Sequence, residues 1–309
     1  MLFRSQITRV ARNEWQKEII REFTALEGAR NLHQLWSDFI IMAACAISNA
    51  VDAEHRQGRE KTYMEIAAKY KPKELESMSK ILADLVMAYE ANSDQDLLGE
   101  LYMALELGND CAGQFFTPYD VCRCMAELNW SNATAKIRDH GFISVNDPAV
   151  GAGALLIAFA NTCRRHDVNY QQSVLFVAQD LDYVTACMCY IQLSLLGCPG
   201  YVCVGDTLTH PCTAIDDRGL LPRPSANLWF TPLYFTEIWQ TRCALAKLDL
   251  FFGRRPGPTL TGIEKNTEAP AEAKADLIDN NSEQDDNGFE ESNNEIEFLT
   301  NENGQFMLF

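Results

Sequence analysis

Residues 142–159 read FISVNDPAVGAGALLIAF, and this stretch decides the fold. A short apolar run ends at Asp147-Pro148, two glycines follow at Gly151 and Gly153, and an apolar, helix-forming segment comes next. This order predicts a strand, a tight loop and a helix. At such a junction the first helical N–H groups have no backbone partner and glycine leaves the chain bare, so the turn can hold a polar ligand closely. The alternative is a plain strand-to-helix turn that contains glycines without binding anything.

The same pattern repeats twice further along the chain. Apolar runs at residues 173–178 and 201–204 predict two more strands, with helices between them. Apolar strands separated by helices indicate a parallel sheet covered on both faces, with all strand carboxyl ends on one edge. Asp147, Asp180 and Asp206 stand at those ends, where open α/β sheets bind ligands. Each aspartate could equally be a simple cap of the turn or helix that follows it.

The residues around the glycine loop restrict the ligand. Asp180 lies 27 positions after Gly153, a spacing that suits hydrogen bonds from a ribose diol to a carboxylate. No lysine follows the loop, so it is not a Walker A phosphate site. Leu156 stands where a dinucleotide-binding motif has its third glycine. A nucleoside ligand without a pyrophosphate therefore fits better than NAD.

The chain divides into three regions. Residues 1–110 lack strand alternation and form an all-α N-terminal subdomain, with helices expected at 31–51, 59–70, 74–91 and 94–107. An α/β domain is expected over residues 111–253, and its last elements are a helix at 235–246 and a short strand at 248–252. Residues 254–309 are predicted to be an acidic disordered tail, because Asn, Asp, Glu and Ser dominate there and aromatic residues are sparse.

The net charge is spread unevenly. Residues 260–309 contain 13 acidic residues and two lysines, which account for most of the net charge of −17. The globular part is only mildly acidic. Overall charge therefore neither supports nor excludes nucleic-acid binding, which a local basic patch would have to provide.

Composition favours a cytoplasmic protein. The N-terminal residues MLFRSQITRV lack the apolar core of a secretion signal, and the longest apolar run, at 39–47, is too short to span a bilayer. The 11 cysteines are an odd number scattered through helices and strands, which is typical of reduced, buried thiols. No His and Cys cluster has the spacing of a metal site, so neither a metal nor a membrane is expected as a partner.

Four motifs occur in an order that is familiar from one protein family. They are GQFFTP at 113–118, DPAVGAG at 147–153, AQD at 178–180 and GDTL at 205–208. Taken together, they resemble the modification subunit of type I restriction systems, the S-adenosylmethionine-dependent adenine-N6 DNA methyltransferases. The resemblance spans residues 97–208, and it is the set of motifs that is specific. It implies a Rossmann-like methyltransferase core, S-adenosylmethionine as cofactor and DNA as substrate.

The resemblance also implies a role for each matching residue. Phe116, Thr117 and Pro118 would close over the methionine end of the cofactor. The loop beneath the cofactor's amino acid moiety comprises Asp147, Pro148, Gly151 and Gly153. Asp180 would bind the ribose, and Asp206 would lie near the adenine and accept a hydrogen bond from its exocyclic amine.

The family's catalytic motif is altered in this chain. The family reads Asn/Asp-Pro-Pro-Phe/Tyr after its fourth strand, where the Asn side chain accepts from the target amine and the aromatic ring stacks on the flipped base. The chain has no Pro-Pro pair, and NLWF at 227–230 stands at about the expected distance. Asn227 would keep the acceptor and Phe230 the stacking ring. The alternative is that Trp229 and Phe230 simply pack in the core.

The α/β domain is also short. It has room for fewer strands than a complete methyltransferase sheet, so the sheet is expected to be truncated. It has no separate segment for recognising a target DNA sequence, which points to a separate specificity or partner subunit. The apolar Phe306-Met307-Leu308-Phe309 could dock on such a partner, although an inert end is the commoner case.

Three functions are compatible with these features. The first is methylation of adenine N6 in DNA as part of restriction-modification, with S-adenosylmethionine as methyl donor. The second is a catalytically impaired, methyltransferase-like protein that binds the cofactor or a partner in a regulatory or anti-restriction role. The third, an NAD-dependent enzyme, is disfavoured by the missing third glycine.

Overall fold

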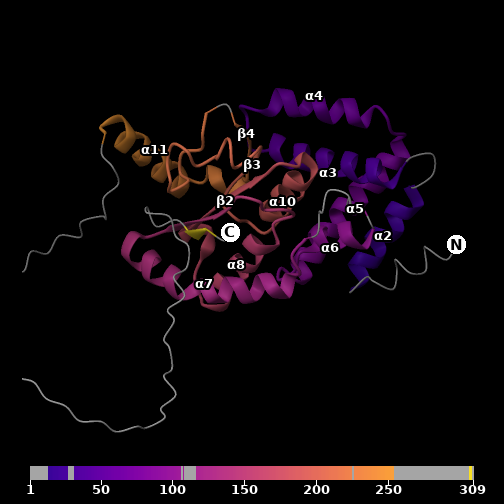
Figure 1. The fold of residues 1–309 in the computed structure, drawn as a ribbon. Helices are drawn as coiled ribbons and strands as arrows, with labels where there is room; N and C mark the ends of the chain where they lie inside the picture. The colour runs from indigo at the N-terminus through magenta and orange to yellow at the C-terminus, as the bar shows by residue number, and fades with distance from the viewer. Residues whose placement is uncertain are drawn as a thin grey trace, which may run out of the picture.

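The computed structural model describes residues 13–26, 31–105, 107, 116–224, 226–253 and 306–307. The first part of the chain is a group of helices, as the apolar spacing predicts (Figure 1). These helices are α2 (Glu14–Leu26), α3 (Leu32–Asn49), α4 (Arg56–Ala67), α5 (Pro72–Ala91) and α6 (Leu97–Ala104). The described residues up to 105 contain no strand.

The local sequence explains where these helices begin. Asp96 stands before α6, and its side chain accepts a hydrogen bond from the Gly99 amide at 3.1 Å. Pro72 opens α5, a position where its missing N–H has no helical partner to lose. The Glu74 carboxylate then accepts from the Lys71 amide at 2.7 Å and holds the first turn.

Helix α7 (Tyr119–His140) leads into an alternation of strands and helices. The elements that follow are β1 (Ile143–Asp147), α8 (Ala154–Arg165), the short α9 (Tyr170–Ser173), β2 (Val174–Asp180), α10 (Tyr183–Leu195) and β3 (Gly200–Val204). β1, β2 and β3 are parallel neighbours, with Asp147 opposite Ala178 and Asp180 opposite Val204. The prediction of three parallel strands in a mixed α/β fold is confirmed.

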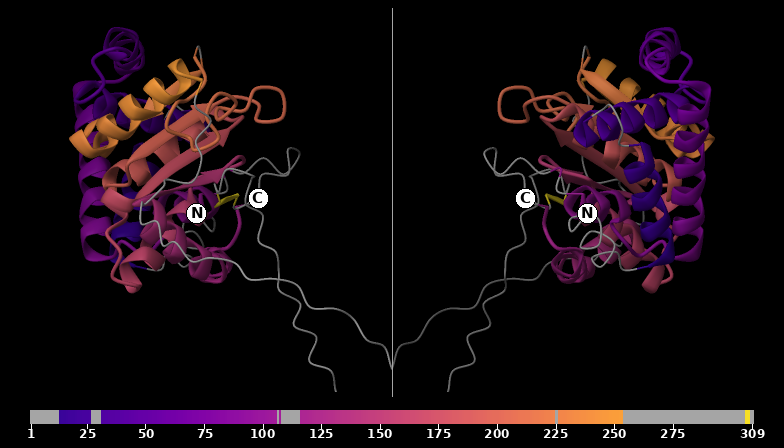
Figure 2. Two further views of the ribbon diagram at one scale, coloured as in Figure 1. Left: turned by 90° about the vertical axis from the view of Figure 1, so that its left-hand side faces the viewer. Right: turned by 90° about the vertical axis from the view of Figure 1, so that its right-hand side faces the viewer.

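Alternate side chains of the sheet enter two different hydrophobic clusters. Phe176 and Val202 belong to a cluster with α8, α10 and the helices of the first part. Val177 and Tyr201 point the other way and pack with Trp239 of α11 (Glu237–Phe251). Consecutive residues of a strand point to opposite faces, so helices cover both sides of the sheet (Figure 2).

The chain departs from a parallel sheet after β3. β4 (Asn227–Phe230) pairs with β3 in the antiparallel direction, and η1 (Pro232–Phe235) then leads into α11. The short strand predicted at residues 248–252 is wrong, because α11 continues through these residues as far as Phe251. A short apolar run fits either a strand or the end of a helix, and here the preceding helix simply extends.

The other edge of the sheet is occupied by residues from far along the chain. β5 (Phe306–Met307) pairs in parallel with β1, so the strand order is β4-β3-β2-β1-β5 (Figure 2). The prediction of an acidic disordered tail at 254–309 does not include a strand at these two residues. The rest of the predicted tail lies outside the described residues. The division into regions 1–110, 111–253 and 254–309 stays a prediction.

Candidate functional site

Asp180 ties together the loops that follow β1, β2 and β3. One side-chain oxygen of Asp180 accepts a hydrogen bond from the Gly151 amide at 2.8 Å, and the other accepts one from the Asp182 amide at 2.9 Å. The backbone carbonyl of Asp180 accepts a third from the Gly205 amide, also at 2.8 Å. The three loops therefore gather at one edge of the sheet, as the parallel order of the strands requires.

The loop between β1 and α8 depends on its glycines. Gly151 has φ +57° and Gly153 has φ +102°, backbone angles at which other residues are strained. A Cβ added to Gly151 would lie 3.3 Å from Cδ1 of Phe116, so the Phe116 ring covers the loop. A Cβ added to Gly153 would lie 3.0 Å from Sγ of Cys189 in α10. Phe116 and α10 therefore leave little room for larger side chains here.

Asp147 and Asp180 give this edge a negative charge that depends on pH. Burial raises the pKa of Asp147 to about 6, and the neighbouring Asp180 carboxylate adds to the rise. Burial also raises the pKa of Asp180, against the opposing effect of the Asp182 and Gly151 amides. An opposite charge placed here would stabilise both ionised carboxylates, so the edge favours a cationic group.

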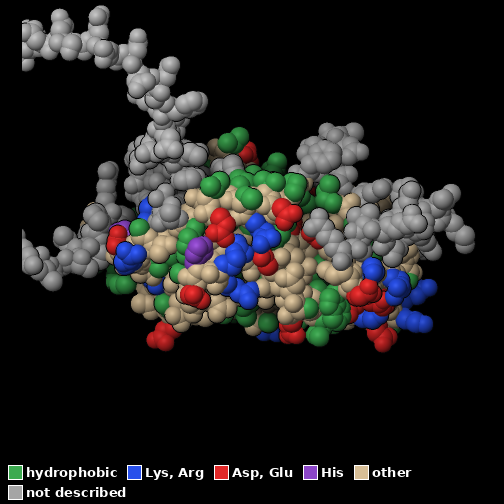
Figure 3. Space-filling model, turned by 90° about the horizontal axis from the view of Figure 1, so that it is seen from below, with side chains coloured by type: hydrophobic (Ala, Val, Ile, Leu, Met, Phe, Trp, Pro, Cys, Tyr) green, Lys and Arg blue, Asp and Glu red, His purple; other side chains and the backbone are tan. Residues whose placement is uncertain are grey.

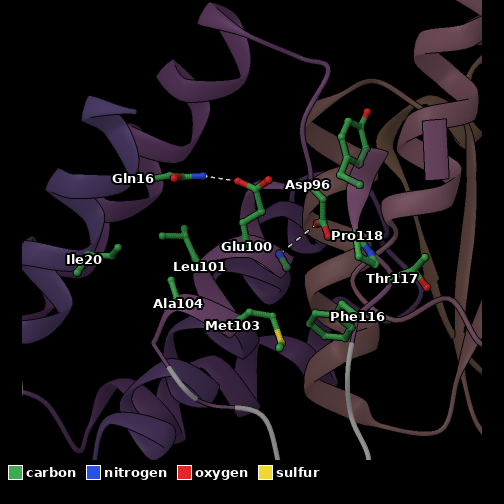
Figure 4. A pocket seen from close by; sticks show the side chains of 12 residues that line it. Gln16, Ile20, Asp96, Glu100, Leu101, Met103, Ala104, Phe116, Thr117 and Pro118 are labelled. Atoms are coloured by element: carbon green, nitrogen blue, oxygen red, sulfur yellow. Dashed lines mark hydrogen bonds between the residues drawn. The ribbon is translucent and has the colours of Figure 1, made fainter. Parts of the chain in front are cut away.

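A cavity of about 240 Å³ shares the Phe116 side chain with the glycine loop (Figure 4). Thr117 and Pro118 continue its wall beyond Phe116, and α6 forms the facing wall with Asp96 and Glu100. This volume is below the roughly 300–1,000 Å³ of typical small-molecule pockets, so the cavity suits one end of a ligand. Its lining is part polar and part apolar.

Gln192 of α10 connects the glycine loop to α5 and α6. Its Nε2 donates to the Asp96 carboxylate and to the Ala152 carbonyl, each at 2.7 Å. Its Oε1 accepts from the Leu98 amide at 2.9 Å and from the Tyr89 hydroxyl. Sequence reasoning missed this residue. Its signal is a lone glutamine in the apolar helix YVTACMCYIQLSL, where a buried amide needs partners.

Asp206 holds the turn after β3. Its carboxylate accepts from the Leu208 amide and from the Thr209 hydroxyl, each at 2.9 Å. The Thr209 hydrogen bond is the main reason that the pKa of Asp206 is lowered. The Thr207 hydroxyl donates to the Pro148 carbonyl, so this turn also contacts the glycine loop. Both Asp206 oxygens act within their own turn, as expected for a cap.

Asn227 and Phe230, the predicted catalytic pair, lie away from the glycine loop. β4 borders β3, whereas the loop follows β1, two strands further along. Phe230 is opposite Tyr201 near the start of β3 and stacks on Tyr234 with ring centroids 4.6 Å apart. Asn227 is exposed and opposite Val204, at the carboxyl end of β3. Phe230 therefore lies at the opposite end of β3 from the loops of the site, whereas Asn227 lies at the carboxyl edge that also leads to Asp206.

The middle of β4 is fixed to the first helices by Arg59 of α4. The Arg59 guanidinium donates to the Leu228 carbonyl, and to the Asp52 carboxylate at 2.7 Å. Its central carbon lies 4.0 Å from the ring centroid of Trp229, a cation–π contact. Trp229 is only 2% exposed. At Trp229, the interpretation of this segment as core packing is confirmed.

The described residues offer few alternative sites. No group of three or more His, Cys, Asp or Glu residues within them could hold a metal ion. Ten cysteines in these ranges are free thiols, of which Cys124 is exposed. No helix in the same ranges is long and apolar enough to cross a membrane.

Two basic side chains at the end of α8, Arg165 and His166, are paired with acids. Arg165 contacts Asp94 at 3.0 Å and Glu127 at 2.8 Å, and His166 contacts Glu127 at 3.0 Å. The view from below shows basic and acidic side chains interspersed over one face (Figure 3). The side chains of described residues on that face therefore form no continuous basic surface of the kind that binds the DNA backbone.

One family model matches the chain. The N-6 DNA methylase model matches residues 93–221, a range that includes α6, the glycine loop and the loops after β2 and β3. The match ends before Asn227, so β4 lies outside it. No curated protein matches the chain at a significant level.

Proposed function

We propose, from the match of residues 93–221 to the N-6 DNA methylase model, that the chain binds S-adenosylmethionine at the carboxyl edge of β1, β2 and β3 and methylates adenine N6 in DNA. The observation that carries this proposal is the contact set of the glycine loop. Asp180 accepts from the Gly151 amide, and Phe116 covers Gly151. The proposal includes a Rossmann-like methyltransferase core with a truncated sheet.

The loop residues can hold a nucleoside with an amino acid attached. Each Asp180 oxygen accepts one amide and has a further lone pair, which can take a ribose hydroxyl. Gly151 and Gly153 leave the backbone uncovered, so an amino acid moiety can approach it closely. Asp147 and Pro148 set the start of this loop, with the Asp147 carboxylate accepting from the Ala149 amide at 3.1 Å.

The remaining predicted residues surround these contacts. Phe116, Thr117 and Pro118 line the cavity beside the loop, which would receive the methionine end. Asp206 holds the turn that would border the adenine. Leu208 in that turn is 94% exposed and Leu181 after β2 is 75% exposed, and an adenine ring would cover such apolar side chains.

The charge of the site also fits this cofactor. When bound, S-adenosylmethionine supplies an electrophilic methyl group on a positively charged sulfonium, beside an α-ammonium. The Asp147 and Asp180 carboxylates would attract both positive groups. The pKa of Asp147 is raised to about 6, so the attraction from this carboxylate strengthens as the pH rises through that value. The pKa of Asp180 is also raised by burial, so its attraction strengthens with pH as well.

Methyl transfer to DNA makes a further demand. The target amine has to be aligned, and its hydrogens need acceptors, but no covalent protein intermediate is required. In the proposal Asn227 provides an acceptor and Phe230 a stacking face for a flipped base. DNA is the substrate, a separate specificity or partner subunit selects the target, and the complex works in the cytoplasm.

A second candidate function is supported by the position of β4. Asn227 and Phe230 lie beyond β3, and the family match ends at residue 221. A catalytically impaired relative would keep the cofactor site and lose methyl transfer. Such a protein would hold the cofactor or a partner in a regulatory or anti-restriction role.

A cofactor titration tests the binding half of the proposal. Gly151→Arg would place a side chain against the Phe116 ring at a φ of +57°, and we expect it to abolish binding of S-adenosylmethionine in a calorimeter. Gly58→Arg is the matched control, because Gly58 is an exposed position of α4 with nothing within 4 Å of an added Cβ. Equal affinities of the two variants would contradict the loop assignment.

A methylation assay separates the two candidate functions. The chain is incubated with labelled S-adenosylmethionine and adenine-rich DNA, and N6-methyladenine is then measured. Product from the unmodified chain that is lost in Asn227→Ala supports the enzyme. Cofactor binding without product above the Asn227→Ala level supports the impaired protein.

A further inference from the structure

The outer edge of β1 is buried to a degree that is unusual for an edge strand. In the described residues β1 has β2 on one side and only the two-residue β5 on the other. All of β1 is nonetheless buried, with Val145 at 0% and Asn146 at 5% exposure. Edge strands normally present their N–H and C=O groups to water. This burial includes the cover that β5 provides, and the pairing with β5 gives N–H and C=O groups on the outer edge of β1 their partners.

β5 is a strand of the same chain. Val145 is opposite Phe306 and Asn146 is opposite Met307, in the parallel direction. Parallel neighbours need a connection of roughly a dozen or more residues, and residues 148–305 between β1 and β5 are more than enough. The last part of this connection, residues 254–305, is rich in acidic residues, whereas the sequence turns apolar from Phe306 onward. The change in composition coincides with the residues that join the sheet.

We propose that the outer edge of β1 is a docking site for an extended apolar strand, and that Phe306–Met307 fills it in cis as a releasable latch. The pairing covers two of the five residues of β1, so it is short enough to open. Because the latch belongs to the same chain as β1, its pairing is intramolecular and does not depend on protein concentration. While closed, it excludes other extended peptides from this edge.

The latch lies next to the candidate ligand site. Asn146, which is opposite Met307, directly precedes Asp147. The Asp147 side chain in turn accepts from the Ala149 amide and shapes the start of the glycine loop. Opening of the latch would free the end of β1 and loosen that loop. This coupling rests on the proposed function, whereas the docking itself does not.

Hydrogen exchange of the full chain tests the docking. In the unmodified chain we expect the amides of Phe306 and Met307 to exchange at least about 10-fold more slowly than in an isolated peptide of residues 303–309. The double variant Phe306→Pro, Met307→Pro lacks both N–H donors, and the amides at 145–147 should then exchange about 10-fold faster. Adding the peptide of residues 303–309 should restore their protection.

A matched control removes part of the connection and keeps the latch. Deletion of residues 266–295 should leave exchange at 145–147 unchanged, because β5 is retained. Exchange of Phe306 and Met307 at the rate of the isolated peptide, measured in the unmodified chain, overturns the docking. Unchanged exchange at 145–147 in the double variant overturns it as well. If the double variant unfolds, the amides of β2 also lose protection from exchange. The docking is then judged from the exchange rates of Phe306 and Met307 in the unmodified chain alone.

Cofactor titration of the same proteins tests the coupling. We expect the double variant to bind S-adenosylmethionine at least about 3-fold more weakly than the unmodified chain, because opening of the end of β1 costs binding energy. Unchanged affinity together with faster exchange at 145–147 overturns the coupling and keeps the docking. Absence of binding to the unmodified chain counts against the proposed function, and the exchange result at β5 then stands by itself.

Discussion

Replacing Gln192 with leucine removes the side-chain amide that joins the glycine loop to α5 and α6. Gln192 is fully buried and takes part in four hydrogen bonds. Leucine is of similar size, so it fills the space without offering a donor or an acceptor. The Asp96 carboxylate, the Ala152 carbonyl, the Leu98 amide and the Tyr89 hydroxyl each lose one partner.

The size of the effect follows from these four groups. A buried polar group left without its partner costs about 1–3 kcal/mol. At the lower end of this range the four together give about 4 kcal/mol, a large share of the roughly 5–15 kcal/mol that stabilises a protein. Burial raises the pKa of Asp96 to about 6, and the hydrogen bond from Gln192 opposes this rise. In Gln192→Leu that hydrogen bond is lost, so the pKa of Asp96 should rise further.

Urea unfolding measures this loss. With a slope of roughly 2–3 kcal/mol per molar urea, Gln192→Leu should lower the unfolding midpoint by about 1.5–2 M. The control Gln57→Leu lies on the exposed side of α4 and should stay within about 0.5 kcal/mol of the unmodified chain. Should Gln192→Leu unfold at the same midpoint as Gln57→Leu, the connecting role of Gln192 would be refuted.

Three further predictions use other parts of the site. Gly153→Ala places a Cβ at a φ of +102° and 3.0 Å from the Cys189 sulfur, so this variant should lose about 1–3 kcal/mol of stability in urea unfolding. The control Gly58→Ala in helix α4 should gain up to about 1 kcal/mol. The reverse order of the two stabilities would contradict the loop geometry. Asp96 and Asp147 have pKa values of about 6 in the folded chain and about 3.9 in the unfolded chain. Between about pH 4 and pH 6 these carboxyls are therefore protonated in the folded state and ionised in the unfolded state. Stability should therefore fall by up to about 3 kcal/mol per group as the pH rises from about 4 through 6, and Asp147→Asn should flatten that profile; an unchanged profile would count against it. Asn227→Ala, an exposed substitution at the far edge, should change the unfolding free energy by less than about 0.5 kcal/mol and leave the affinity for S-adenosylmethionine unaltered, which calorimetry can check.

The parallel part of the fold follows from local pattern. Apolar runs that are followed two positions later by an aspartate predicted β1, β2 and β3 to within one or two residues. The pattern succeeds because strands buried on both faces are apolar throughout, and the crossover helices force their carboxyl ends onto one edge. The glycine loop followed from Gly151 and Gly153, whose backbone angles other residues adopt only with strain.

The elements after β3 could not be read in the same way. The direction of β4 depends on how residues 205–226 return to the sheet, and residue types in a four-residue strand do not encode direction. The apolar run at 248–252 has a composition that suits helix and strand alike, and only its continuity with α11 decides. β5 joins β1 across more than 150 residues of sequence, a pairing for which the local pattern carries no information.

The contacts of the site likewise divide into those that local sequence predicts and those that only the fold creates. Asp180 was found because its position after a strand is a local feature. Gln192 was missed because its partners come from α5, α6 and the glycine loop, and only the fold brings them together. Phe230 was predicted to stack on a base from its place in the sequence, whereas the fold surrounds it with Tyr201, Tyr234 and Phe235. Its catalytic role stays a proposal.

The most direct test of the cofactor site is hydrogen exchange of the unmodified chain with and without S-adenosylmethionine. The account predicts slower exchange at residues 147–153, 178–182 and 205–208 when the cofactor is present, and no change in β4. No slowing at residues 147–153 under saturating cofactor would contradict it.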